Sequence, residues 1–159
     1  MKSNPTLIRR WSLKGQQPEI NTYYGYTAKS IFGSVNLTNG DLIYRFASRQ
    51  NQKEFIRHLR QILNKYPKKT IWLYADRAGW HTGRRVKQFL HEHKRLKLKH
   101  LPAYSPQLNP VERLWKFMRL NVTHNRFYRL VPSFEASLRK FFKLISRKNK
   151  KIYALCSSI

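Results

Sequence analysis

The chain has 159 residues, 41% of them hydrophobic, and its 33 lysines and arginines against seven acidic residues give a formal net charge of +26. This length suits one domain with a packed core, and the apolar content excludes a disordered basic tail. Such a charge requires a polyanionic partner. Nucleic acid is the commonest, although a ribosomal or other RNA-packing protein would be as basic.

Cysteine content and hydropathy indicate the compartment. Cys156 is the single cysteine, so an internal disulfide is excluded, and no Cys/His spacing of zinc type occurs. The sequence contains neither a transmembrane-length apolar run nor a secretory segment near Met1. We therefore expect a soluble, cytoplasmic protein without a membrane partner.

The first elements predict a hairpin. Residues 1–25 carry prolines and glycines with little periodicity and predict an irregular lead-in. Residues 28–35 and 42–46 have the β-branched and aromatic content of strands, and Asn39-Gly40-Asp41 between them is a tight-turn signal.

The middle of the chain alternates helices and strands. A helix is predicted from about Asn51 to Lys65, before Pro67. The nearly continuous apolar run Ile71–Ala75 is typical of a strand buried on both faces. A helix from about Thr82 to His93 and a strand at Leu96–Leu101 follow.

The last third of the chain predicts a rigid loop and two helices. After the proline-rich loop, Asn109 is a good N-cap and Pro110 a good first residue for a helix. The last predicted helix runs from about Ser133 to Ile145 with a basic outer face. That face could bind a membrane surface or a partner, although DNA contact agrees better with the basic charge of the whole chain. The complete order predicts an α/β fold with a mixed sheet and flanking helices.

Two acids stand out in a chain that has so few. Asp76 follows the predicted buried strand, and Glu112 is the third residue of the helix capped by Asn109, 36 positions further on. Carboxylates are the ligands of hard divalent cations, and two-metal sites hold the attacking and leaving oxygens of a phosphodiester. Each acid alone also has a structural explanation, since Asp76 can cap a strand end and Glu112 can complete a capping box.

Other candidates are weaker. His81 is a lone histidine, a type that more often packs or faces solvent than catalyses, and His91 and His93 are spaced for different helix faces. Three aromatic residues, Tyr104, Trp80 and Trp115, could stack on bases, although Trp115 suits the core better.

Two segments resemble the DDE transposases of bacterial insertion sequences in the mariner superfamily. They are Leu73-Tyr-Ala-Asp-Arg-Ala-Gly-Trp-His81 and Leu101-Pro-Ala-Tyr-Ser-Pro-Gln-Leu-Asn-Pro-Val-Glu-Arg-Leu-Trp115. The family typically shows Asp-Asn-Ala-x-x-His and then Tyr-Ser-Pro-x-Leu-Asn-Pro-x-Glu, with about 35 residues between its second and third catalytic acids. Asp76 and Glu112 match those positions, and the likeness covers roughly residues 5–130.

The resemblance implies an RNase H-like fold and Mg²⁺- or Mn²⁺-dependent cleavage and strand transfer of DNA at transposon ends. Residues 1–130 would form the endonuclease domain, and residues 131–159 its basic C-terminal helix and tail. Asp76 and Glu112 would be the catalytic acids and metal ligands, with His81 and Asn109 supporting them. The candidate DNA-binding residues are Arg77, Arg84, Arg85, Lys116, Arg139 and Lys143.

The chain departs from the family pattern at several positions. Arg77, Ala103 and Gln107 stand where the family usually has Asn, Pro and Asp. The family's first catalytic acid ends a central strand shortly before the segment that matches Pro5–Gly15, and no counterpart precedes that segment here. Asp41, the only other aspartate, lies in the hairpin turn and is interpreted as a turn residue.

These departures predict the C-terminal part of a transposase with an incomplete RNase H-like fold. We expect it to be catalytically deficient on its own, with exposed sheet edges that favour pairing with an upstream transposase segment or a second copy. Its partners would be transposon ends and target DNA, and its location the nucleoid. The alternative is a non-catalytic nucleic-acid-binding remnant of the same fold.

Overall fold

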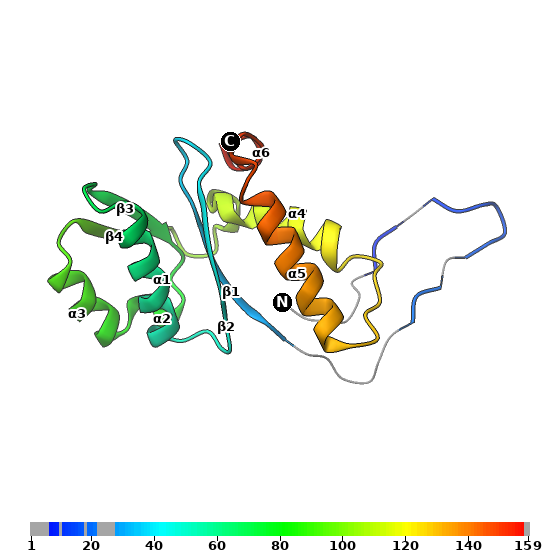
Figure 1. Cartoon of the computed structure of the whole chain (residues 1–159), viewed down its shortest axis with the longest axis horizontal. Helices are drawn as coiled ribbons and strands as arrows, with labels where there is room; N and C mark the ends of the chain where they lie inside the picture. Colours follow the sequence, from blue (N-terminus) through cyan, green and yellow to red (C-terminus); the bar gives the residue numbers. More distant parts are fainter. Residues whose placement is uncertain (1–6, 10, 18, 22–27, 158–159) are drawn as a thin grey trace.

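The structure is a computed structural model that describes residues 7–9, 11–17, 19–21 and 28–157. Its elements alternate in an α/β order (Figure 1). In chain order they are β1 (Ser30–Val35), β2 (Leu42–Ala47), α1 (Gln52–Lys65), β3 (Ile71–Ala75), α2 (Gly79–Thr82), α3 (Arg84–Glu92), β4 (Leu96–His100), the 3₁₀ turn η1 (Pro106–Leu108), α4 (Pro110–Val122), α5 (Val131–Ile145) and α6 (Asn149–Ser157).

The predicted hairpin is confirmed. β1 and β2 pair antiparallel from Ser30 opposite Ala47 to Val35 opposite Leu42. Gly40 in the turn adopts φ +73°, a left-handed conformation that glycine reaches without steric cost.

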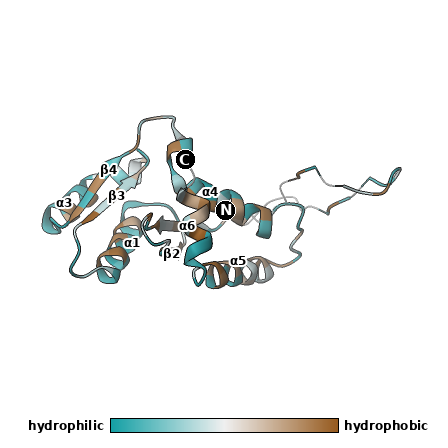
Figure 2. Cartoon of the chain, turned by 90° about the horizontal axis from the view of Figure 1, so that it is seen from above, coloured by the Kyte–Doolittle hydropathy of each residue, from teal (hydrophilic) through white to brown (hydrophobic). Residues whose placement is uncertain are grey.

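The hairpin lies between two groups of elements (Figures 1 and 2). Because side chains alternate along a strand, its two faces enter different cores. Phe32 and Ala47 join a core with α1, α3 and β4, whereas Ile31, Tyr44 and Phe46 pack against α4, α5 and α6. The first core contains Phe32, Ala47, Phe55, Leu59, Ile62, Leu63, Val86, Phe89 and Leu96. The second contains Leu114, Met118, Val122, Phe134, Leu138, Phe142, Ile145, Ile152 and Cys156.

Helix α1 begins and ends as predicted. The Asn51 side chain accepts a hydrogen bond from the Glu54 backbone N–H at 2.9 Å, which caps the helix. The Glu54 carboxylate also pairs with Arg45 on β2 at 3.1 Å, and with Arg57 one turn further along α1. These contacts fix α1 against the hairpin.

Strands β3 and β4 pair in parallel, with Ile71 opposite Leu96 and Ala75 opposite His100. Among the described strands, this pair is a separate sheet from the β1–β2 hairpin. The α/β class is therefore confirmed, with parallel and antiparallel pairing divided between two small sheets.

One prediction about these elements is wrong, and two helices were not predicted. β3 is not buried on both faces, because Trp72 and Tyr74 are 57% and 59% exposed. The helix predicted from about Thr82 to His93 is confirmed as α3, but the short helix α2 before it was not predicted, and Gly83 separates the two in an extended conformation (φ −68°, ψ 161°). Helix α6 follows α5 where only a tail was predicted, and it packs Ile152 and Cys156 into the second core.

The lead-in has neither helix nor strand in residues 7–9, 11–17 and 19–21, whereas Pro5, Pro18 and Gly25 lie outside the described residues. One point of the lead-in is anchored. The Asn125 side chain exchanges two hydrogen bonds with the Ile8 backbone, at 3.0 and 3.1 Å.

Candidate functional site

Asp76 directly follows β3, at the end of the parallel pair. Its side chain is 61% exposed. Oδ1 accepts a hydrogen bond from the Ala78 backbone N–H at 3.1 Å. Within the described part of the chain, Oδ2 has neither a hydrogen bond nor an ion pair, so one carboxylate oxygen remains available to a ligand.

Two histidines hold this strand end in place. His81 Nδ1 lies 2.7 Å from Asp76 Oδ1 and 3.2 Å from the Asp76 backbone oxygen. Both oxygens are acceptors, so Nδ1 must carry a proton. His81 is 13% exposed and its ring lies 4.2 Å from that of Phe55, centroid to centroid, so the residue packs and orients Asp76 at once.

His100 is a neighbour that sequence reasoning missed. Its Nδ1 lies 3.1 Å from the Asp76 backbone oxygen. The signal was available, because His100 ends the strand next to β3 and the carboxyl ends of parallel strands meet at one edge.

Glu112 lies in the first turn of α4. Asn109 caps this helix through its side-chain oxygen, which accepts a hydrogen bond from the Val111 N–H at 3.3 Å, and Pro110 begins the helix as predicted. The Glu112 carboxylate does not complete a capping box, since among the described residues it makes no hydrogen bond or ion pair. The structural explanation considered for this acid is therefore absent.

The two acids line one pocket, although 36 positions separate them in sequence. The loop from Leu101 to Ser105 forms one wall, and Arg77 and Asn109 also contribute. The cavity has a volume of about 380 Å³. The fold thus brings together four sequence-predicted residues, Asp76, Arg77, Asn109 and Glu112, while His81 reaches the pocket through its contact with Asp76.

Tyr104 is an unusual member of the pocket wall. It adopts φ 55° and is fully exposed. The left-handed region is uncommon for a bulky side chain and costs about 1–3 kcal/mol. An aromatic ring held out beside two acids suits contact with a ligand better than contact with the core.

The pocket matches a divalent cation in the kind of ligand but not in number. Carboxylate oxygens are the right donors for Mg²⁺ or Mn²⁺. However, no group of three or more His, Cys, Asp and Glu side chains placed to hold a metal occurs among the described residues. The described residues therefore place two carboxylates in one pocket, fewer than a two-metal site needs.

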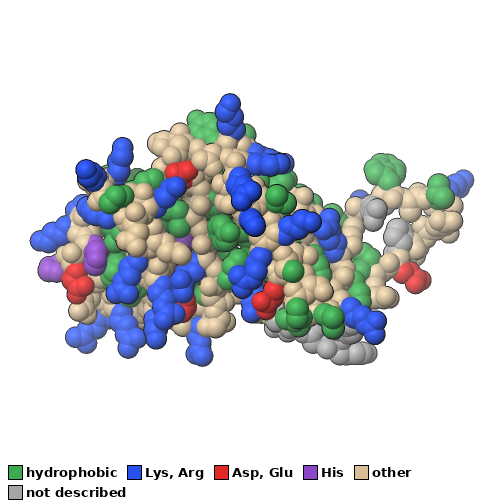
Figure 3. Space-filling model, in the orientation of Figure 1, with side chains coloured by type: hydrophobic (Ala, Val, Ile, Leu, Met, Phe, Trp, Pro, Cys, Tyr) green, Lys and Arg blue, Asp and Glu red, His purple; other side chains and the backbone are tan. Residues whose placement is uncertain are grey.

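The six basic candidates come from several elements of the fold. Arg77 lines the acidic pocket, and Arg84 and Arg85 begin α3. Lys116 is exposed on α4, one turn after Glu112, and Lys143 is exposed on α5. Figure 3 shows Lys and Arg side chains over both halves of the molecule.

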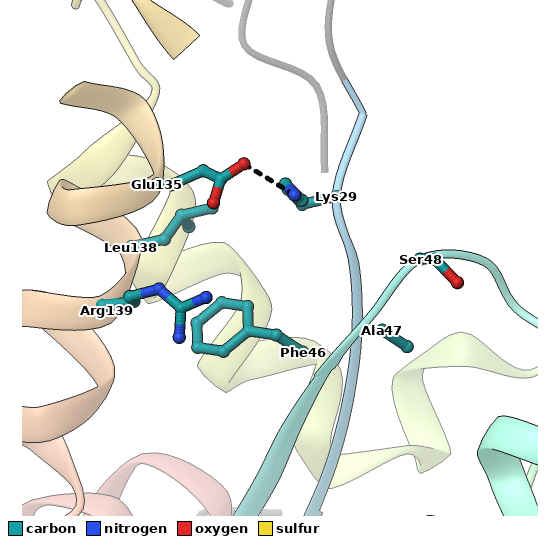
Figure 4. A pocket seen from close by; sticks show the side chains of 7 residues that line it. All are labelled: Lys29, Phe46, Ala47, Ser48, Glu135, Leu138 and Arg139. Carbon is teal, nitrogen blue, oxygen red and sulfur yellow. Dashed lines mark ion pairs between the residues drawn. The ribbon is translucent and has the colours of Figure 1, made fainter. Parts of the chain in front are cut away.

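Arg139 borders a second hollow, between β2 and α5 (Figure 4). Its guanidinium carbon lies 4.9 Å from the centroid of the Phe46 ring, and Lys29 pairs with Glu135 at 2.6 Å nearby. The Glu135 carboxylate lines this hollow and pairs with Lys29, so side-chain packing explains the hollow better than anion binding does.

The remaining sequence candidates have structural roles. Trp115 packs against Gly33 and Phe142 in the second core, as expected, while Trp80 packs at the edge of the first core. The His93 ring stacks on Phe89 at 4.1 Å between centroids, and its Nδ1 lies within hydrogen-bonding distance of the Phe89 backbone oxygen, so His93 packs at the end of α3.

Asp41 is confirmed as a structural residue. Its carboxylate accepts hydrogen bonds from Tyr66 at 2.9 Å, Asn149 at 2.8 Å and Asn39 at 3.0 Å, with Lys65 at 3.9 Å. Burial alone would raise the pKa of Asp41, but these hydrogen bonds and the lysine charge outweigh it and lower the pKa.

The chain matches one protein family and is similar to two insertion-element and bacterial proteins. Residues 1–135 match the family described as DDE superfamily endonuclease. The insertion element IS630 uncharacterized 39 kDa protein of Shigella sonnei is 26% identical over 144 residues, which cover 90% of this chain and 42% of that protein. The uncharacterized protein y4pE/y4sA of Sinorhizobium fredii is 42% identical over 57 residues, or 36% of this chain and 39% of that protein.

Solved structures of Mos1 transposase share the fold. The paired-end complex with the left transposon end matches with a TM-score of 0.65 and 18% identity, over 96% of this chain and 51% of that one. The Mos1 catalytic domain matches with a TM-score of 0.59 and 18% identity, over 81% of this chain and 71% of that one. The fold is thus RNase H-like, and the chain spans about half the length of these longer relatives or less. The described residues contain no helix long and apolar enough to cross a membrane.

Proposed function

The chain belongs to the DDE superfamily of endonucleases, and on that premise we propose that it is the C-terminal part of a DDE transposase that acts on DNA. The observation that carries the proposal is the shared pocket of Asp76 and Glu112, two of the seven acidic residues in a chain of net charge +26. The Mos1 structures that share its fold include complexes with transposon ends and a strand transfer complex. The activity would be metal-dependent DNA cleavage and strand transfer at transposon ends, in the nucleoid.

Asp76 and Glu112 would hold Mg²⁺ or Mn²⁺, the ions present in two of the Mos1 paired-end complexes. The bound ions would supply Lewis acidity at the phosphate and lower the pKa of the attacking hydroxyl. His81 would fix the Asp76 carboxylate through Nδ1, and Asn109 would hold the start of α4 and so the position of Glu112. Arg77 would contact the DNA backbone beside the acids, and Arg84, Arg85, Lys116, Arg139 and Lys143 would extend this contact.

The isolated chain would be catalytically deficient, because two carboxylates are fewer than a two-metal site needs. A further acid would come from an upstream transposase segment or a second copy. Two observations support such pairing. Among the described strands, β1 pairs with β2 and β3 with β4, so each sheet keeps an open edge, and the chain spans only 42% of its insertion-element relative.

A fusion tests this proposal. The residues of the 39 kDa relative that precede its matching region would be joined to the present chain, and cleavage of a transposon-end duplex measured in Mg²⁺ and Mn²⁺. We expect cleavage by the fusion, its loss in D76N and in E112Q, and none by the 159-residue chain. Robust cleavage by the chain alone, abolished in D76A, would refute the deficiency. A fusion that cleaves equally well in D76N would refute the site.

The second candidate function is a non-catalytic nucleic-acid-binding remnant. The six basic candidates are exposed on several elements, and this exposure favours a binding remnant as much as an enzyme. The two differ in metal dependence. A remnant would bind DNA with a steep salt dependence and would be indifferent to both D76N and divalent metal.

A further inference from the structure

The outer face of the β3–β4 sheet is exposed and consists of aromatic and basic side chains. Trp72 and Tyr74 of β3 are 57% and 59% exposed, and Lys97 and Lys99 of β4 are exposed beside them. The register pairs Trp72 with Lys97 and Tyr74 with Lys99, so the four side chains share one face. We call this set, Trp72, Tyr74, Lys97 and Lys99, the outer platform.

The opposite face of the same sheet packs against the first core. Ile71, Leu73, Leu96 and Leu98 point to the other side, where they pack against the first core beside α1 and α3. The strands are therefore anchored without the outer platform. An exposed tryptophan and tyrosine at neighbouring positions of one strand face are not explained by folding, and such surfaces mark interaction sites.

The lysines identify the kind of partner. Lys99 Nζ lies 5.6 Å from the centroid of the Trp72 ring, so a positive charge is held beside the aromatic surface. Protein–protein interfaces are enriched in aromatic residues but depleted in lysine. Neither β3 nor β4 carries an acid, so the platform attracts a polyanion with flat apolar groups.

We propose that the outer platform binds unpaired single-stranded DNA, with bases stacked on Trp72 and Tyr74 and phosphates contacted by Lys97 and Lys99. Ring faces stack on base faces, which are accessible in a single strand and hidden in a duplex. Strand geometry separates alternate residues by about 7 Å and neighbouring strands by about 5 Å, so the aromatic residues and the lysines offer different contacts to bases and backbone.

The platform leads into the acidic pocket. The alternation of exposure continues from Trp72 and Tyr74 to Asp76, which is 61% exposed. A single strand lying on the platform would therefore run toward Asp76. The inference deepens the proposed function, on which its biological meaning rests, but the binding itself can be measured without any cleavage.

The test uses fluorescence anisotropy of a labelled short oligodeoxythymidylate with the full chain, over a range of sodium chloride concentrations. W72L/Y74L removes the rings but keeps apolar side chains, and we expect it to weaken binding by about tenfold or more at every salt concentration, with an unchanged salt slope. W72F/Y74F keeps two rings and should bind the oligonucleotide far more tightly than W72L/Y74L does. Y153L is the matched control, because Tyr153 is an exposed aromatic residue on α6.

The lysines give a second, independent readout. K97Q/K99Q changes exposed side chains, which should leave the fold intact, and it should reduce the slope of log affinity against log salt by about 1.4. Binding of the matching duplex should be unchanged in W72L/Y74L. Binding is measured in EDTA without divalent metal, where the proposed cleavage cannot take place, so failure of the catalytic proposal and failure of the platform are separable.

Two results would overturn the platform. One is a folded W72L/Y74L, checked by circular dichroism, that binds the oligonucleotide like the original chain, together with an unchanged slope in K97Q/K99Q. The other is unchanged binding with a shift from dimer to monomer in sedimentation, which would assign the face to a second copy of the chain.

Discussion

The hairpin turn and the end of β3 each contain one of the two aspartates, and their surroundings differ completely. Asp41 is enclosed by Tyr66, Asn149, Asn39 and Lys65. Asp76 is mostly exposed, and one of its oxygens has no partner within the described residues. Scarcity of acids marks both residues in the sequence, but only the surroundings separate an acid that holds the fold from one that can hold a ligand.

The hairpin turn connects two helices that are far apart in the sequence. Asp41 joins the end of α1, through Tyr66, to the start of α6, through Asn149. The β3 end makes its contacts locally, apart from His100. Substitutions should therefore cost stability at the turn and function at the strand end.

Gly40→Ala gives the largest expected effect. A Cβ at Gly40 would lie 2.1 Å from the Asn149 backbone oxygen, and the residue adopts φ +73°. The clash and the strain together should cost about 4 kcal/mol in the free energy of unfolding, measured by urea denaturation. Gly79→Ala is the control, because a Cβ there meets nothing within 4 Å. Equal losses of unfolding free energy in both variants would contradict the close packing of the hairpin turn against Asn149.

Acidification should produce the next largest loss. His58 lies buried on α1, and this burial lowers its pKa from 6.5 to about 4. Asp41 also has a lowered pKa. In both cases the unfolded chain binds more protons, so stability falls as pH falls. His58 alone should contribute about 3 kcal/mol of loss between pH 6.5 and 4. H58Q should flatten this part of the stability–pH curve, whereas an unchanged curve would refute the assignment.

Asp41→Ala should cost about 2 kcal/mol in the free energy of unfolding, because it leaves the Tyr66 and Asn149 donors without their acceptor. The matched change Asp76→Ala removes an exposed carboxylate and should cost about 0.5 kcal/mol or less. Thermal and urea unfolding of the two variants compare the regions directly, and a larger loss in Asp76→Ala would reverse the comparison.

The smallest effect is expected at Glu112. Since its carboxylate caps nothing among the described residues, Glu112→Ala should change the unfolding free energy by less than about 0.5 kcal/mol. Asn109→Ala, which removes the α4 cap, should cost about 1 kcal/mol. A Glu112→Ala variant as unstable as Asn109→Ala would restore the capping explanation.

Local signals predicted most of the fold. The Asn39-Gly40-Asp41 turn, the Asn51 cap and the Asn109–Pro110 helix start are decided by nearby residues, and all are confirmed. The shared pocket of Asp76 and Glu112 followed from the strand end and from the family resemblance.

Tertiary packing decided the rest. An apolar run such as Ile71–Ala75 does not reveal whether a second layer covers it, so the exposure of Trp72 could not be predicted. Gly83 divides α2 from α3 through its extended backbone, a conformation that helical periodicity ignores. Helix α6 is stabilised by burial of Ile152 and Cys156 rather than by a strong pattern of its own.

Mn²⁺-induced broadening of backbone amide signals in the NMR spectrum would locate the metal-binding acids, because a bound paramagnetic ion broadens the signals of its neighbours. We expect selective broadening at residues 76–78 and 111–113, lost in D76N/E112Q, with the signals of residues 39–41 unaffected. Broadening centred on Asp41, or broadening at Asp76 that survives D76N/E112Q, would contradict the assignment of Asp76 and Glu112 as the metal-binding acids.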